Sequence, residues 1–176
     1  MQRPQLEHIL RAAAGITGAT EFVVIGSQAV LGQFPDAPEE LLVSIEADVF
    51  SLRSEADSDL IDGTIGEGSP FHQTFGYYAH GVSVETARLP EGWRERLVPI
   101  RNENTGGGTG LCLEIHDLAV SKLVAAREKD LDFVTGLLCH RLIQPEIVRQ
   151  RIALTPLESE AARLCLARLK RLEAAS

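Results

Sequence analysis

The chain has 176 residues, and its 17 basic and 25 acidic side chains give a formal net charge of −8. With 44% hydrophobic and 24% charged residues, the composition is that of one folded domain and excludes a disordered chain, a collagen-like chain and a coiled-coil rod. No apolar run reaches the roughly 18 residues of a membrane-spanning helix, and the N-terminus lacks the apolar core of a signal peptide. We therefore expect a cytoplasmic protein with no membrane association.

The first fifty residues predict one helix, two strands and a loop between them. Apolar residues recur at helical spacing over Leu6–Ala14, and the β-branched and aromatic run Glu21–Ile25 predicts a buried strand. A helix is expected to start at Gln28–Leu31, and two prolines three residues apart make Phe34–Pro38 a loop. Alternating side chains then predict a second strand over Leu42–Phe50.

The middle of the chain predicts a helix and further short strands. Ala56–Ile65 has a helical pattern, and Val82–Thr86 is expected to form the third strand. Leu97–Ile100 is expected to be an edge strand, because Pro99 has no amide hydrogen to donate to a neighbouring strand. The glycine-rich segment Asn102–Gly110 predicts a turn, which leads into Leu111–Leu113.

The last third of the chain is predicted to be helical. Four helices are expected, with Asp117 capping the first and Thr155 the last: Leu118–Asp130, Phe133–Leu142, Pro145–Ile152 and Leu157–Glu173. The predicted fold class is therefore α+β (mixed α/β), a small mixed sheet with flanking helices followed by a helical part. We expect a core over residues 1–116 and a helical region over residues 117–176, packed as one unit. The three cysteines, at positions 112, 139 and 165, are predicted to be reduced thiols in the core.

Two carboxylates on one strand are the first candidate for chemistry. Glu46 and Asp48 lie two residues apart, so their side chains share one face of the predicted strand, with roots about 6–7 Å apart. That spacing lets both carboxylates bind one divalent cation, and Mg²⁺ prefers such oxygen ligands together with substrate phosphates. The alternative is a strand face that merely contacts water. Leu42 and Phe50 share that face, which weakens the alternative.

A glycine-serine turn and a lysine suggest a phosphate site. Gly26 directly after a buried strand allows a close backbone approach, and Ser27 offers a hydroxyl to a phosphate oxygen. Ordinary tight turns use the same residues, so this signal alone is weak. Lys122 lies in an apolar helical segment, where it either extends to solvent or reaches a polyanion.

The charges are unevenly distributed along the chain. Residues 1–140 carry a net charge of −11, whereas residues 141–176 carry +3. An acidic body does not attract a phosphate backbone over its whole surface. The basic C-terminal helices offer a local nucleic-acid surface, and the competing interpretation is a solvated helix face.

Several blocks of sequence resemble a known family. The segments are Val24–Leu31, Ser44–Val49, Ile61–Gly66, Phe71-His72, Gly76–Tyr78, Leu89–Arg94, Asp117–Leu123 and Arg127–Asp130. They are similar to the minimal nucleotidyltransferases of the polymerase-β-like superfamily, and more narrowly to the AbiEii/MenT-type bacterial toxin branch. The blocks span about two-thirds of the chain. The sequence departs from the wider superfamily at Glu46, where an aspartate is usual.

The resemblance implies site residues and a cofactor. It implies that Asp48, Glu46, Lys122 and Asp130 are catalytic, that Gly26, Ser27 and Lys122 bind the nucleotide, and that Glu46, Asp48 and Glu85 bind Mg²⁺. The implied reaction moves a nucleoside monophosphate from a nucleoside triphosphate such as ATP to a hydroxyl acceptor.

The resemblance also implies partners. A tRNA 3′ end is the implied acceptor, bound through the basic C-terminal helices, and a cognate antitoxin is the implied protein partner of a toxin. The alternatives are an enzyme that transfers AMP or UMP to a protein, and a catalytically inactive nucleotide-binding or protein-interaction module.

Overall fold

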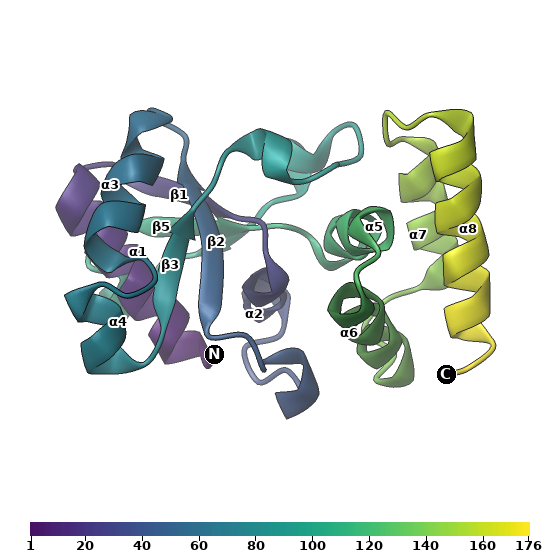
Figure 1. Cartoon of the computed structure of the whole chain (residues 1–176), viewed down its shortest axis with the longest axis horizontal. Helices are drawn as coiled ribbons and strands as arrows, with labels where there is room; N and C mark the ends of the chain where they lie inside the picture. Colours follow the sequence, from purple (N-terminus) through teal and green to yellow (C-terminus); the bar gives the residue numbers. More distant parts are fainter.

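A five-stranded mixed sheet forms one end of the molecule and helices α5–α8 form the other (Figure 1). The computed structural model describes all residues from 1 to 176. The strands are β1 Glu21–Val24, β2 Glu46–Ser51, β3 Tyr78–Gly81, β4 Val98–Ile100 and β5 Thr109–Cys112. The helices are α1 Arg3–Thr17, α2 Val30–Gln33, α3 Ala56–Ile65, α4 Pro70–Phe75, α5 Ile115–Ala125, α6 Glu128–Cys139, α7 Pro145–Ala153 and α8 Ser159–Glu173. The predicted α+β class is confirmed.

The strands follow the order β3-β2-β1-β5-β4 across the sheet. β2 pairs antiparallel with β1 and parallel with β3, and β5 pairs parallel with β1 and antiparallel with β4. β4 is an edge strand, as Pro99 predicts, because proline cannot donate to a second neighbour. β2 therefore has partners on both sides, and its side chains are held at fixed positions.

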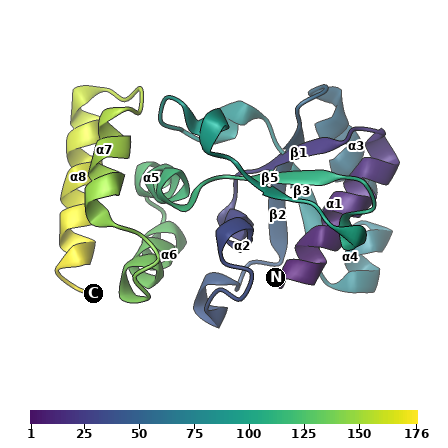
Figure 2. The same ribbon diagram turned by 180° about the vertical axis from the view of Figure 1, so that it is seen from behind.

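One apolar core joins the two ends of the molecule. A continuous cluster of 43 buried hydrophobic residues includes side chains from the sheet and from α5–α8. Helix α1 packs against α3 and β5, and the turned view in Figure 2 shows α1 beside the sheet and α2 between the sheet and α5–α6. The tight packing is visible at Gly110, where an added methyl group would collide with Leu10. No helix is both long and apolar enough to cross a membrane.

Two strands differ from the sequence prediction. The second strand begins only at Glu46, and Val43 and Ile45 before it lie in a loop, with exposed fractions of 79% and 48%. The third strand is Tyr78–Gly81, whereas the predicted segment Val82–Thr86 ends in a short 3-10 helix, Val84–Thr86. The parallel pairing with β2 ends at Gly81, and the Val82 carbonyl then accepts a hydrogen bond from the Ser58 hydroxyl of α3 instead of continuing a sheet ladder.

The predicted single helix over residues 118–130 is two helices. α5 starts earlier, because the Glu114 side chain accepts hydrogen bonds from the amides of His116 and Asp117 and so caps the helix. Ala126 adopts a left-handed conformation with φ 53°, which ends α5. Arg127 follows as the residue immediately before α6. The carbonyl of Lys122 accepts the Ala126 amide hydrogen at this break.

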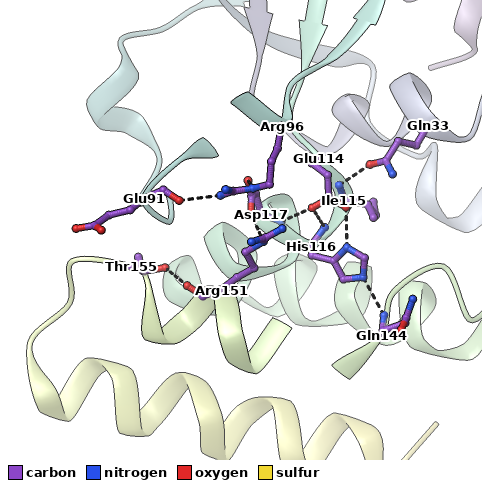
Figure 3. Close-up of polar contacts among 10 residues, drawn as sticks. All are labelled: Gln33, Glu91, Arg96, Glu114, Ile115, His116, Asp117, Gln144, Arg151 and Thr155. Carbon is purple, nitrogen blue, oxygen red and sulfur yellow. Dashed lines mark hydrogen bonds and ion pairs between the residues drawn. The ribbon is translucent and has the colours of Figure 1, made fainter. Parts of the chain in front are cut away.

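Asp117 is a buried ionic centre and not the predicted helix cap (Figure 3). Arg96 donates a hydrogen bond of 2.8 Å to Asp117, and Arg151 of α7 forms a 3.1 Å ion pair with it. Arg96 also donates to the carbonyl of Glu91, and Thr155, predicted to cap the last helix, donates to the carbonyl of Arg151. These bonds connect the segment before β4 with α5 and α7.

The thiols differ in exposure. Cys112 and Cys165 are buried as predicted, but Cys139 at the end of α6 is exposed, so the prediction of three core thiols is wrong for this one. Burial raises the pKa of the Cys112 thiol to about 12 and also raises that of Cys165. Both buried groups therefore stay protonated at pH 8, and a protonated thiol is a poor nucleophile.

We expect a single fast-reacting thiol in the native protein, because only Cys139 meets solvent. Titration with an aromatic disulfide reagent at pH 8 should show one thiol reacting at once and three after denaturation. The Cys139→Ser variant should lack the fast phase. A second fast thiol in the native protein would contradict the burial of Cys112 and Cys165.

Candidate active site

A cleft of about 450 Å³ opens between the sheet and helices α5 and α6. Four residues singled out in the sequence line it: Ser27, Glu46, Asp48 and Lys122. His80, Arg127 and Lys129 also line it, although the sequence did not identify them as site residues. The β2 carboxylates lie on the sheet side of the cleft, and the helical side carries these cationic side chains together with the Asp132 carboxylate.

The two carboxylates project from the same face of β2, as the alternation of a strand requires. The Glu46 and Asp48 side chains are 35% and 26% exposed, so both are partly withdrawn from water. The Tyr78 hydroxyl donates a 2.9 Å hydrogen bond to Oε2 of Glu46. His80 Nδ1 lies 3.2 Å from Oδ1 of Asp48 and 3.5 Å from Oε1 of Glu46.

The proximity of these groups shifts their pKa values. Burial, followed by the neighbouring Glu46, raises the pKa of Asp48 to about 6. Burial also opposes ionisation of Glu46, but its interactions with Asp48 and with the Tyr78 hydroxyl outweigh burial and lower the pKa of Glu46. Burial opposes protonation of His80, but the Asp48 carboxylate outweighs burial, so the pKa of His80 is raised overall. The carboxylate face therefore has an excess of negative charge that a cation would relieve.

Gly26 allows the Gly-Ser turn to lie against the carboxylates. The Ile25 amide donates to the carbonyl of Asp48, which continues the β1–β2 pairing up to the turn. A methyl group added at Gly26 would overlap the Asp48 carboxylate, so any larger residue at this position must displace the Asp48 side chain. The hydroxyl of Ser27 lines the cleft and forms no hydrogen bond within the protein. It is thus free to bind a ligand.

Asp130 holds the cationic side of the cleft in place. Its carboxylate is fully buried and accepts hydrogen bonds from Lys122 at 2.9 Å and from Arg127 at 2.6 Å. Burial opposes ionisation, but these two partners lower the pKa of Asp130, which stays charged. Because both carboxylate oxygens are already bound, Asp130 positions Lys122 and Arg127 and does not itself line the cleft. Lys129 is exposed at the rim and has no ion pair.

The structure separates Glu85 from the predicted metal ligands. Glu85 was expected on a strand, but it lies exposed in the 3-10 helix Val84–Thr86 and does not line the cleft. The third side chain beside Glu46 and Asp48 is His80, and these three form the single group of side chains in the structure with metal-binding spacing, their ligand atoms within 4.8 Å of one another. His80 lies two residues after Tyr78, so both side chains share one face of β3. This spacing could point to the site only once the strand β3 and its pairing with β2 were known.

The arrangement suits one kind of ligand. Carboxylates that share a face with an imidazole can bind a divalent cation. Lys122, Arg127 and Lys129 across the cleft, with the free Ser27 hydroxyl, can bind phosphate oxygens. A cation–polyphosphate complex would satisfy both sides at once.

Comparison with known proteins identifies a family. A family model described as "Nucleotidyltransferase of unknown function (DUF6036)" matches residues 5–166. No curated protein and no solved structure matches the chain significantly. The match spans the sheet, the cleft and most of the helical end, so it covers every residue of the candidate site.

Replacing Gly26 by alanine should disturb the carboxylates directly. The added methyl group must displace Asp48, so we expect affinity for a divalent cation to fall by about tenfold or more. Binding of Mn²⁺, a paramagnetic probe, measured by electron paramagnetic resonance checks this. The matched control is Gly15→Ala in α1, where nothing lies within 4 Å; it should leave binding unchanged and stabilise the helix by about 0.5–1 kcal/mol. Equal binding by the Gly26 variant and the wild type would contradict the proposed contact.

Replacing Asp130 by asparagine should destabilise the fold. The neutral amide cannot match the charge-assisted hydrogen bonds from Lys122 and Arg127, so we expect the free energy of unfolding to fall by about 2 kcal/mol. Chemical denaturation followed by circular dichroism measures this. Asp132→Asn is the control, because Asp132 lies exposed on the same helix and its loss should change stability by less than about 0.5 kcal/mol. Similar effects of the two substitutions would refute the role given to Asp130.

Proposed function

Because the chain belongs to this family of nucleotidyltransferases, we propose that its cleft transfers a nucleoside monophosphate from a nucleoside triphosphate to a hydroxyl acceptor. In this reaction the acceptor oxygen forms a bond to the α-phosphorus, the bond to the bridging oxygen breaks, and pyrophosphate leaves. The family supports nucleotidyl transfer in general. The cation, the nucleotide and the acceptor are our further proposals.

The observation that carries the proposal is the opposition of charges across one cleft. Glu46 and Asp48 lie on the sheet side, and Lys122 and Arg127 lie on the helical side of the same 450 Å³ space. A triphosphate needs cationic partners along its length, and a cation bound to it needs oxygen ligands from the protein. The lining of the cleft includes both sets.

Each side chain has a distinct task in the proposed reaction. Lys122, held by Asp130 at 2.9 Å, neutralises charge that develops on the leaving pyrophosphate. The Ser27 hydroxyl binds a phosphate oxygen and so helps to fix the triphosphate for in-line attack. Arg127 is 62% exposed at the cleft and has guanidinium hydrogens left to bind phosphate, because a guanidinium has five donors.

The residues present fit a divalent cation. Glu46, Asp48 and His80 have their ligand atoms within 4.8 Å of one another, and the two adjacent carboxylates concentrate negative charge there. We propose Mg²⁺ as the working cation, with Glu46 and Asp48 as its carboxylate ligands; when bound, it supplies charge neutralisation and orientation of the reacting oxygens. Tyr78 keeps one oxygen of Glu46 engaged, which leaves the other directed toward His80.

We propose that the acceptor is the 3′ end of an RNA, specifically of a tRNA. For the biological role, we propose that the protein is a toxin of the AbiEii/MenT type that is paired with a cognate antitoxin. The resemblance of the sequence blocks supports this choice. The basic residues of the C-terminal helices contribute little to it, because Arg149, Arg151 and Arg163 are already paired with carboxylates of the same chain. Arg141, Lys170 and Arg171 form no such pair, and Lys129 at the cleft rim adds a further free cation.

The Asp48→Ala variant should abolish most of the transfer. Removing a cation ligand from the reacting centre should lower the rate on the order of 100-fold or more. In the assay, the protein is incubated with each labelled nucleoside triphosphate in turn, together with total tRNA or lysate protein. The label transferred to the acceptor is then measured. The control is Asp59→Ala, an exposed carboxylate on α3 outside the cleft, which should keep full activity.

The outcomes separate the candidate functions. Label on tRNA that requires Asp48 supports the proposal, and label on protein would move the acceptor to a protein hydroxyl. Unchanged labelling by the Asp48 variant would show that the reaction does not use this cleft. No labelling and no nucleoside triphosphate binding by the wild type would refute the enzyme proposal.

A further inference from the structure

His80 lies where its imidazole faces both carboxylates. In the parallel pairing of β2 with β3, Asp48 is the Cα partner of His80 and Glu46 is the partner of Tyr78. Side chains of paired residues project from the same face of a sheet, so the imidazole lies beside the carboxylates. The pairing therefore brings His80 beside two carboxylates that precede it by more than thirty positions in the sequence.

The distances match those between ligands of one cation. Ligand atoms about 2.1 Å from an octahedral ion lie about 3 Å apart when they are adjacent. His80 Nδ1 lies 3.2 Å from the Asp48 oxygen and 3.5 Å from the Glu46 oxygen. The ligand atoms of all three groups lie within 4.8 Å of one another, so the side chains must draw closer together to reach the spacing of three ligands on one face of an ion.

The surroundings orient each ligand. The Tyr78 hydroxyl binds Oε2 of Glu46, so Oε1 is the oxygen that faces His80. Next to His80, the Gly81 amide donates a 2.7 Å hydrogen bond to Asp62 of α3, which fixes the backbone that carries the imidazole. Such outer contacts are typical of built metal sites, because they hold ligands in position before the ion binds.

An ordinary ion pair explains these contacts less well. The His80 side chain is 50% exposed, and a charged pair at such exposure contributes little stability. Two carboxylates around one imidazole also leave one negative charge uncompensated. A divalent cation would neutralise that charge with the imidazole in its neutral form.

We propose that Glu46, Asp48 and His80 together form a three-ligand site that binds Mn²⁺ more tightly than Mg²⁺. The inference rests on the proposed function for the working role of a cation, and goes beyond it by naming the third ligand and the selectivity. A neutral imidazole nitrogen is a good ligand for first-row transition ions. Mg²⁺ prefers oxygen and releases its waters reluctantly, so a nitrogen ligand benefits it less.

Electron paramagnetic resonance of Mn²⁺ added to the full chain tests this without an activity assay. Electron spin-echo modulation should show coupling to an imidazole nitrogen in the wild type and none in His80→Ala. The control His140→Ala removes an exposed imidazole that contacts Glu40 at the cleft, and it should keep the nitrogen coupling. Nitrogen coupling that survives in His80→Ala would overturn the proposal.

Displacement of Mn²⁺ by Mg²⁺ measures the selectivity. We expect the wild type to prefer Mn²⁺ by about tenfold or more, and His80→Ala to lose most of this preference. His80→Asp should still bind both ions, but with a smaller preference, because its third ligand is again an oxygen. An unchanged preference in both variants, or tighter Mg²⁺ than Mn²⁺ binding in the wild type, would overturn the assignment.

The outcomes also distinguish this inference from the proposed function. Nucleotidyl transfer with Mg²⁺, but with no nitrogen coupling to Mn²⁺, would leave the function standing and refute the role of His80. Nitrogen-coordinated Mn²⁺ without transfer of any nucleotide would support the metal site and refute the enzyme.

Discussion

The backbone pairing of β2 holds two carboxylates side by side against their mutual repulsion. β3 pairs with β2 over Glu46–Val49, and β1 pairs with it from Val49 onward and through the Ile25 amide at Asp48, so the backbone that carries both carboxylates is held in place. Burial and then the neighbouring Glu46 raise the pKa of Asp48. The Gly26 turn, the Tyr78 hydroxyl and the His80 imidazole are all placed relative to this pair. The chemistry of the cleft depends on this constraint.

The helical end carries cationic side chains, and two buried carboxylates hold them in place. Asp130 binds Lys122 and Arg127, and Asp117 binds Arg96 and Arg151. Burying a charged carboxylate costs free energy of desolvation, and attraction to cationic partners offsets that cost. Each of these two carboxylates has two such partners. Asp117 thereby ties α5 to its neighbours, and Asp130 directs α5 and α6 side chains toward the cleft. Asp117 thus stabilises the packing of the helical end, and Asp130 fixes the positions of the cationic side chains of the site.

The sequence predicted the elements whose signal is local. Ala56–Ile65 is a helix with the predicted bounds, and Glu21–Val24 is a strand within the predicted range, because helical and strand periodicity are visible over a few turns. The errors arise where a tertiary contact overrides the local pattern. Ala126 breaks a helix in a segment without glycine or proline. Val82–Thr86 has strand composition, but its pairing with β2 stops at Gly81 although β2 continues to Ser51, and the Val82 carbonyl is bound by the Ser58 hydroxyl of α3.

The sequence by itself determined the fold class, the glycine-serine turn after a buried strand, and the shared face of Glu46 and Asp48. Each of these follows from neighbouring residues and from the period of a helix or strand. Only the tertiary structure decided that His80 stands beside the acids and Glu85 does not, and that Asp130 positions cations from inside the core. Strand register and burial couple residues that are distant in the chain, and no local pattern encodes that coupling.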